Sequence, residues 1–235
     1  MLMARALILL ASLLVFGTIK GQGTVFIPKV GLVGGVSNFS NFQSLPLISY
    51  HASLAFEGYE EGAKNSFFGQ IGIHNRGSNV RVLAPIGINS AIDRRQNIML
   101  SNISGQVGLK NRISSNNERR PYYSFGIRLE YTLSNNFESF EELAGFLPLE
   151  PFINKWNYGA SLAFGYEFEF SELFGGIVEA SLHPDLSFQY NQQQSITINA
   201  PINGQAVVLP RRQVRNVTFE LSFGLRLINK VVYIN

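Results

Sequence analysis

Residues that could carry out nucleophilic or acid–base chemistry are concentrated in one short segment, HPDLS at residues 183–187. His183, Asp185 and Ser187 share one parity of an alternating pattern, so on a strand they would share one face, as a hydrolytic triad requires. However, alternate residues on a strand lie about 6 to 7 Å apart, and here the acid stands between the base and the nucleophile. The order therefore predicts a structural polar cluster. Pro184, which has no N–H, predicts irregular strand pairing at this point.

Composition argues against several other kinds of chemistry. The chain of 235 residues has no cysteine, which excludes disulfides, thiolate metal ligands and cysteine catalysis. Its three His and 16 acidic residues are few and scattered, and the glycines of GLVGG at 31–35 lack the spacing of a dinucleotide-binding loop. A formal charge of +3 gives no reason to expect a nucleic-acid partner. We therefore expect no enzyme activity, no cofactor and no metal.

The charged residues alternate with apolar ones in long segments of strand periodicity. The clearest are YYSFGIRLEYTL at 122–133, the segment 158–170, and RNVTFELSFGLRLI at 215–228. In each segment one parity is apolar and the other is polar. The polar parity of these and of weaker segments carries Glu57, Gln70, Arg128, Glu130, Glu167, Glu169, Glu179, Glu220 and Arg226.

Weaker alternations complete a set of eight strands. The predicted strands are 29–37, 48–57, 67–75, 98–110, 122–133, 158–170, 177–190 and 215–228. The connections between them alternate in length, and the long ones, 76–97, 134–157 and 191–214, would all emerge on one side of an up-and-down meander. Transmembrane β-barrels combine short periplasmic turns with long outer loops in this way.

Strand length and aromatic placement favour the same architecture. The three clearest strands exceed the 9 to 11 or so residues that a membrane strand needs. Aromatic residues lie toward strand ends on the apolar parity, as Tyr123 and Tyr131 do, which is typical of interfacial girdles. The sequence thus predicts an all-β fold, an eight-stranded antiparallel up-and-down transmembrane β-barrel. Its apolar parity would face lipid.

An eight-stranded barrel has an interior that side chains just fill. The polar parity must then point into a closed lumen, where unpaired ions would cost several kcal/mol each. We therefore interpret one set of residues as a structural salt-bridge and hydrogen-bond plug. Its charged members are Arg128, Glu130, Glu167, Glu169, Glu179, Glu220 and Arg226.

The N-terminus predicts export. Residues 1–22 combine an early cation, Arg5, with an apolar run at 6–16 and small residues around Gly21, as a secretory signal peptide does. The run is too short for a membrane-spanning helix, and no later window approaches 18 uninterrupted apolar residues. We expect residues 1–22 to be a signal peptide and residues 23–235 to be one outer-membrane barrel domain.

Two other functional classes remain open at this point. A secreted, lipocalin-like binding barrel would turn the apolar parity inward around a small amphiphile. A lipid A-modifying outer-membrane enzyme would need a Ser or His at the outer rim, supported by an acid. The leading interpretation is a non-enzymatic barrel that acts as an anchor or assembly partner through its outer loops.

The outer connections carry the features that could contact partners. Apolar residues at helical spacing in 137–147 predict a short amphipathic helix, which Pro148 ends. Basic residues of these connections would face outer-membrane lipid, where lipopolysaccharide phosphates are abundant. The candidate lipopolysaccharide contacts are Arg94, Arg95, Lys155, Arg211 and Arg212.

The chain resembles the PorT-like outer-membrane β-barrel family, small eight-stranded barrels of Gram-negative bacteria. The resemblance spans nearly all of the mature chain. It rests on KVGLVGGVSNF at 29–39, RRPYYSFGIRLEYTLS at 119–134, WNYGASLAFGYEFEF at 156–170 and RNVTFELSFGLRL at 215–227. It implies an outer-membrane location and an envelope or secretion-system partner, and it supplies no catalytic residues. The chain departs from the family pattern in continuing past the last strand with NKVVYIN.

Overall fold

The computed structural model describes most of the chain after residue 22. It covers residues 23–37, 43–60, 62–85, 91–113, 119–136, 150–193, 197–199, 206–208 and 211–230. The predicted signal peptide and the predicted helix at 137–147 lie outside the described residues. In the part that is described, no helix is long and apolar enough to cross a membrane.

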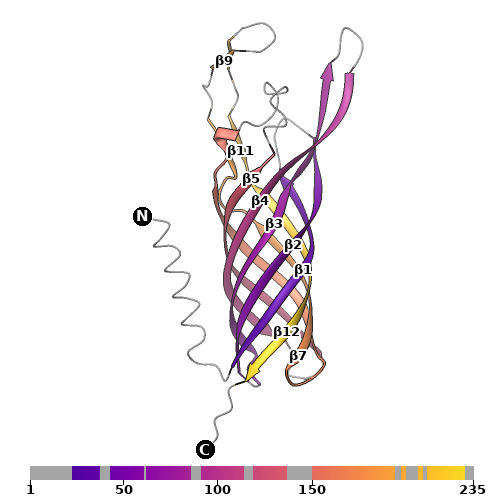
Figure 1. The fold of residues 1–235 in the computed structure, drawn as a ribbon. Coiled ribbons are helices and arrows are strands. Elements are labelled where there is room, and N and C mark those ends of the chain that lie inside the picture. The colour runs from indigo at the N-terminus through magenta and orange to yellow at the C-terminus, as the bar shows by residue number, and fades with distance from the viewer. Residues whose placement is uncertain are drawn as a thin grey trace, which may run out of the picture.

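Eight antiparallel strands close into a barrel (Figure 1). In chain order they are β1 (Gly23–Ser37), β2 (Gln43–Tyr59), β3 (Asn65–Pro85), β4 (Ala91–Arg112), β5 (Arg119–Asn135), β6 (Trp156–Glu169), β7 (Phe174–Pro184) and β12 (Asn216–Lys230). Sequential strands pair with one another, and β12 closes the barrel by pairing with both β7 and β1. The predicted eight-stranded antiparallel up-and-down barrel is therefore confirmed.

The connections give the barrel two different ends. At the lower end β1 begins, β12 ends and the turns between strands are short (Figure 1). The upper end carries the short 3₁₀ helix η2 (Glu150–Phe152) and two small strand pairs. In these pairs β8 (Tyr190–Gln192) joins β11 (Arg212–Val214), and β9 (Thr197–Asn199) joins β10 (Ala206–Val208).

The faces of the strands are arranged as the alternation predicts. On β12, Phe219 and Phe223 are 51% and 53% exposed on the outer wall, while Glu220 and Arg226 are 3% and 0% exposed inside. Apolar side chains cover the outside of the other strands as well, and most of the buried side chains inside are polar, apart from a small apolar cluster to which β1 contributes Val25 and Ile27. This arrangement excludes the lipocalin-like alternative, because such a barrel would have its apolar face inside. The outer wall instead matches the lipid-facing band of a membrane barrel.

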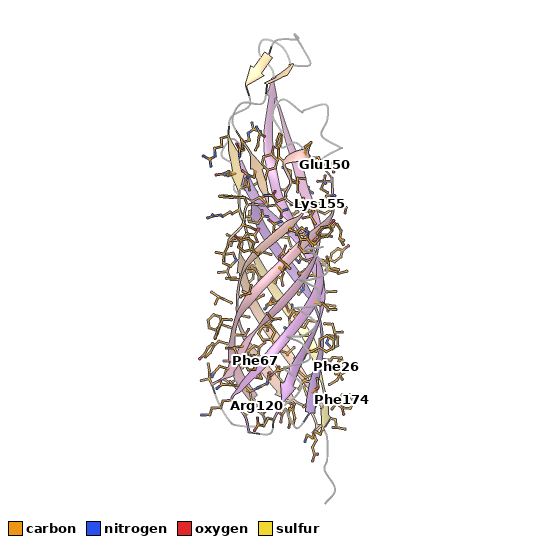
Figure 2. The ribbon with its side chains drawn as sticks, turned by 90° about the vertical axis from the view of Figure 1, so that its left-hand side faces the viewer. Phe26, Phe67, Arg120, Glu150, Lys155 and Phe174 are labelled. Carbon is orange, nitrogen blue, oxygen red and sulfur yellow. The ribbon has the colours of Figure 1, made fainter. Side chains whose placement is uncertain are left out.

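Aromatic side chains mark two levels on the outer wall. Near the lower end Phe26 packs edge-on against Phe56 at 5.0 Å, and Figure 2 places Phe26, Phe67 and Phe174 at similar heights there. Near the upper end the rings of Tyr131 and Trp156 lie 4.8 Å apart. On β6 the exposed rings of Trp156 and Tyr166 are 10 residues apart in sequence. On a strand tilted by about 40° this separation corresponds to about 25 Å, the height of a membrane barrel's apolar band.

Several strand boundaries differ from the prediction; β1, for example, begins at Gly23 and not at residue 29. The connection predicted at 76–97 is mostly strand, because β3 continues to Pro85 and β4 begins at Ala91, and the two pair in register to their ends. This hairpin rises above the barrel in Figure 1. The strand predicted to reach Tyr190 ends instead at Pro184, where the proline removes one N–H from the ladder.

Candidate functional site

The lumen holds two groups of buried ionic side chains stacked along the barrel. The lower cluster consists of Lys29, Glu57, Lys110, Arg112, Glu167, Glu179 and Arg226. The upper cluster consists of His51, His74, Arg76, Arg128, Glu130, His183, Asp185 and Glu220. All of these residues are at most 9% exposed, and they come from all eight barrel strands or the residue following β7.

Two carboxylates organise the lower cluster. Glu167 lies 2.5 Å from Lys110 Nζ, 2.8 Å from Arg112 Nε and 3.4 Å from Arg226 Nη2. Glu57 accepts hydrogen bonds from Lys110 at 2.9 Å and from Arg112. Because β2, β4, β6 and β12 each supply a member, the cluster ties together strands that are not neighbours in the barrel.

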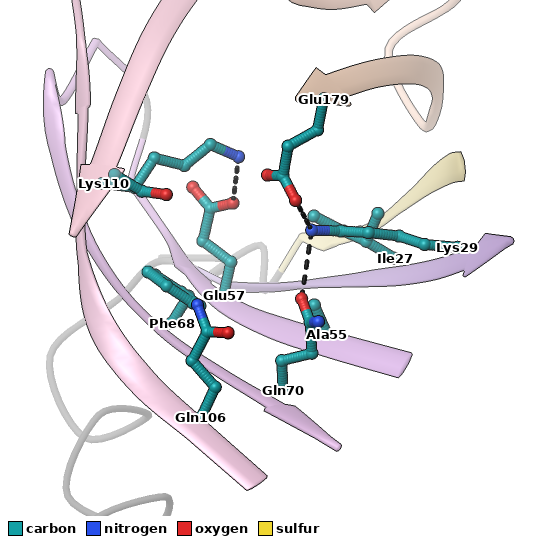
Figure 3. A pocket seen from close by; sticks show the side chains of 10 residues that line it. Ile27, Lys29, Ala55, Glu57, Phe68, Gln70, Gln106, Lys110 and Glu179 are labelled. Carbon is teal, nitrogen blue, oxygen red and sulfur yellow. Dashed lines mark hydrogen bonds and ion pairs between the residues drawn. The ribbon is translucent and has the colours of Figure 1, made fainter. Parts of the chain in front are cut away.

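A second part of the lower cluster borders a small cavity, shown in Figure 3. Lys29 Nζ lies between Glu179 Oε1 at 2.7 Å and Gln70 Oε1 at 3.1 Å, and Tyr122 donates to Glu179 Oε2 at 2.6 Å. The cavity measures about 20 Å³, with Lys110 on its wall. That volume accommodates one water molecule and is far below that of a small-molecule site.

Two arginines organise the upper cluster. Arg76 Nη1 lies 3.0 Å from Glu130 and 2.9 Å from Asp185. Arg128 bridges Glu130 at 2.7 Å and Glu220 at 3.0 Å. Acids and guanidinium groups thus alternate from the end of β7 across the lumen to β12.

All three histidines of the chain lie in this upper cluster. Arg128 Nη2 lies 2.7 Å from His74 Nδ1, and His74 Nε2 lies 3.4 Å from a Glu130 oxygen. His183 Nε2 faces Glu220 Oε2 at 3.4 Å, and His51 Nδ1 faces the same oxygen at 3.9 Å. Residues far apart in sequence are therefore collected around two carboxylates.

One of these contacts has the order of a nucleophile, a base and an acid. His51 Nε2 lies 3.1 Å from Ser222 Oγ, while its other nitrogen faces Glu220. Gly31 makes room for the imidazole, because a Cβ there would lie 2.7 Å from His51 Nε2. The 3.9 Å separation to the acid is too long for a hydrogen bond. Ser222, only 1% exposed, also lies where no acyl substrate can reach it.

The HPDLS segment behaves as the residue order predicts. His183 contacts Ser181 Oγ at 2.9 Å, whereas Ser187 donates to Asn157 Oδ1 at 3.2 Å and accepts from the Tyr158 N–H at 2.9 Å. His183 and Ser187 thus engage different partners. Among the described residues, no group of three or more His, Cys, Asp or Glu is arranged to hold a metal ion.

The upper mouth of the lumen is closed by the residues that follow β7. Gln189, 3% exposed, accepts from Arg76 Nη2 at 2.5 Å and donates to Thr132 Oγ1 at 3.2 Å and to the Asn154 carbonyl at 3.0 Å. These contacts hold the start of the long upper connection across the mouth.

Apart from the histidines, the two clusters are electrically balanced. The cations and carboxylates of the two clusters number six each: Lys29, Arg76, Lys110, Arg112, Arg128 and Arg226 against Glu57, Glu130, Glu167, Glu179, Asp185 and Glu220. Balanced, mutually paired charges favour a plug over an ion path.

Purified protein in a planar bilayer is therefore expected to carry no steady ion current. A steady current would contradict the closed lumen.

The predicted lumen residues fall where the alternation places them. Six of the seven lie in the two clusters, and Glu169 lies at the lower rim, where it pairs with Arg120 at 3.0 Å. Sequence reasoning missed Lys110 and Arg112, because the alternation of β4 does not fix its phase. It also assigned Arg76 to an outer loop, whereas the structure buries that side chain completely in the lumen.

The predicted lipopolysaccharide contacts differ in their exposure in the structure. Lys155 and Arg211 are exposed at the upper end, where Figure 2 labels Lys155. Arg212 is only 7% exposed, which corrects its assignment to the basic surface, because its parity on β11 turns the side chain inward. Arg94 and Arg95 belong to the β3–β4 hairpin, and their side chains lie outside the described part of the structure.

Comparison with known proteins supports the fold. The outer membrane protein OprG from Pseudomonas aeruginosa is similar at a TM-score of 0.53 and 15% identity, over 88% of this chain and 99% of that one. Neisserial surface protein A gives a TM-score of 0.45 at 10% identity, over 86% of this chain and 96% of that one. At 15% identity the likeness to OprG concerns the fold alone.

Sequence comparison does not extend this result. No protein family model matches the chain, and no curated protein sequence matches it. Membership of the PorT-like family therefore stays a prediction.

Proposed function

We propose that this protein is an outer-membrane β-barrel of a Gram-negative bacterium that serves as an anchor or surface-assembly partner through its upper connections. The observation that carries the proposal is the pairing of an apolar outer wall with a lumen filled by mutually paired charges. Such a barrel spans a membrane and transmits nothing through its centre, so its interactions fall to the exposed upper end. Export by a signal peptide at residues 1–22 and membership of the PorT-like family belong to the same proposal.

The structure also bears on the enzyme alternative. The contacts that come nearest to catalytic geometry, those of Ser222 with His51 and of Ser181 with His183, are buried in the lumen, and the cavity there is water-sized. A lipid A-modifying enzyme needs its nucleophile where a lipid can reach it. We therefore infer a non-enzymatic role.

The upper end has a strand pair with exposed side chains that a protein partner can contact. The strand pair of β8 and β11 exposes Gln213, whose side chain donates to Asn191 Oδ1 at 3.1 Å. At the opposite end, the turn between β6 and β7 exposes Glu172, whose side chain is 91% accessible. A crosslinking residue at each of these two positions therefore probes one end of the barrel.

A photo-crosslinking residue at Gln213 is expected to give a discrete protein adduct in living cells, identified by mass spectrometry. The same residue at Glu172 should give either no adduct or periplasmic components only. An adduct confined to Glu172, with none at Gln213, would place the partner at the lower end and contradict the proposed role of the upper connections.

A further inference from the structure

Exposed charge is distributed unequally between the two ends of the barrel. Among the described residues of the upper end, the exposed charged side chains are three basic residues, Lys155, Arg211 and Arg215, and one acid, Glu150. At the lower end the charges are mixed: the exposed Lys64 and the partly exposed Lys230 are accompanied by the exposed Glu60 and Glu172, and Lys230 lies 3.8 Å from Glu172. Among these residues, only those of the upper end present an excess of cations.

Arg215 contacts an aromatic residue, Phe188, and the sequence neighbour of Lys155 is hydrogen-bonded to the backbone of the same residue. The guanidinium of Arg215 lies over the ring of Phe188, 4.4 Å from its centroid. The Phe188 carbonyl accepts a hydrogen bond of 2.7 Å from the side chain of Asn154, which directly precedes Lys155. We call Lys155, Phe188 and Arg215 the upper basic patch.

The patch continues directly into the lipid-facing wall. On the β12 side, Arg215 shares the outward parity of Val217 and Phe219, which are 47% and 51% exposed. On the β6 side, Lys155 directly precedes Trp156, a ring of the upper girdle that is 42% exposed. A cation just above such a girdle stands at the depth of lipid headgroups.

We propose that the upper basic patch binds the phosphate groups of the lipid A part of lipopolysaccharide, with the acyl chains lying on the wall below. This deepens the proposed function and rests on its outer-membrane location. A lipid satisfies both halves of the surface, because phosphate pairs with Lys155 and Arg215 while acyl chains cover apolar side chains such as Val217 and Leu186. A free phosphate ion would satisfy only the cations. Arg215, whose guanidinium is positioned over Phe188, is the central contact.

The test uses purified barrel in neutral detergent, with bound lipid A measured by native mass spectrometry. The double variant Lys155→Gln/Arg215→Gln is expected to bind diphosphoryl lipid A on the order of 10-fold more weakly. The matched control Lys64→Gln/Lys230→Gln removes two cations from the lower end and should leave binding unchanged. Lipid A without phosphates should bind both variants alike, and excess inorganic phosphate should not displace the lipid.

Three outcomes would overturn the proposal: unchanged affinity in the upper variant, an equal loss in the lower control, or full displacement by inorganic phosphate, which would indicate an ion site only. Heat-modifiable migration on gels verifies that each variant is folded. If the double variant does not fold, Arg215→Gln alone should weaken binding and Arg215→Lys should retain it. Because the assay uses isolated protein, its failure is distinct from a failure of the crosslinking experiment in cells.

Discussion

Replacing Glu167 by Gln is expected to destabilise the barrel by about 3 to 5 kcal/mol, the cost of breaking a buried ion pair from one side. Glu167 is 1% exposed and lies within 3.4 Å of Lys110, Arg112 and Arg226. Without its charge, Lys110 and Arg112 would keep Glu57 as their paired carboxylate, and the fully buried Arg226 would keep only a contact of 4.0 Å with Glu169 at the rim. The free energy of unfolding can be measured with guanidinium in lipid vesicles, using the fluorescence of Trp156, the single tryptophan.

The matched control is Glu169→Gln, two residues along the same strand. The Glu169 side chain is 23% exposed and pairs with Arg120, whose side chain is 15% exposed, so solvent screens this interaction; its contact with the buried Arg226 is longer, at 4.0 Å. Its loss should cost at most about 1 kcal/mol. Equal losses for the two variants would show that the lower cluster does not hold the barrel together.

Replacing Phe223 by Arg is expected to destabilise the inserted barrel by about 2 to 4 kcal/mol, because arginine on the lipid face is most costly at the bilayer midplane. Phe223 is 53% exposed on the outer wall and lies midway along β12. The variant should therefore show reduced insertion into vesicles and lose heat-modifiable migration on gels.

The control for Phe223→Arg is a residue on the same face that lies nearer to the membrane interface. Val217 has the same parity and is 47% exposed, but it lies near the upper end of β12, two residues from Arg215. Val217→Arg should cost no more than about 1 kcal/mol, because arginine is tolerated near the interface. Normal insertion of the Phe223→Arg protein would contradict the assignment of this face to lipid.

The alternation of residues 215–228 illustrates how far the sequence alone reaches. A period of two determines both the strand and the residues that share a face, because successive side chains of a strand point to opposite sides. The length of the segment then separates a membrane strand from the shorter strands of soluble proteins. For this reason the residue pattern by itself assigns Glu220 and Arg226 to one face, opposite Phe219 and Phe223.

The extended hairpin shows where composition misleads. Residues 76–97 contain four arginines and a Gly-Ser-Asn segment, which suggest a solvated loop. In the structure most of them are strand, because β3 and β4 satisfy each other's backbone groups in register beyond the rest of the barrel. The ladder depends on backbone pairing with a distant segment, which local composition does not report.

The partners inside the lumen were decided by the tertiary structure. His51, His74 and His183 are distant in sequence, yet closure of the sheet brings them to Glu130 and Glu220. The sequence by itself determined which residues turn inward, because parity is a local property of each strand. It could not determine which acid meets which base, because that choice depends on the register of every strand pair around the barrel. A shift of one residue in any pair would turn that strand's charged side chains toward lipid.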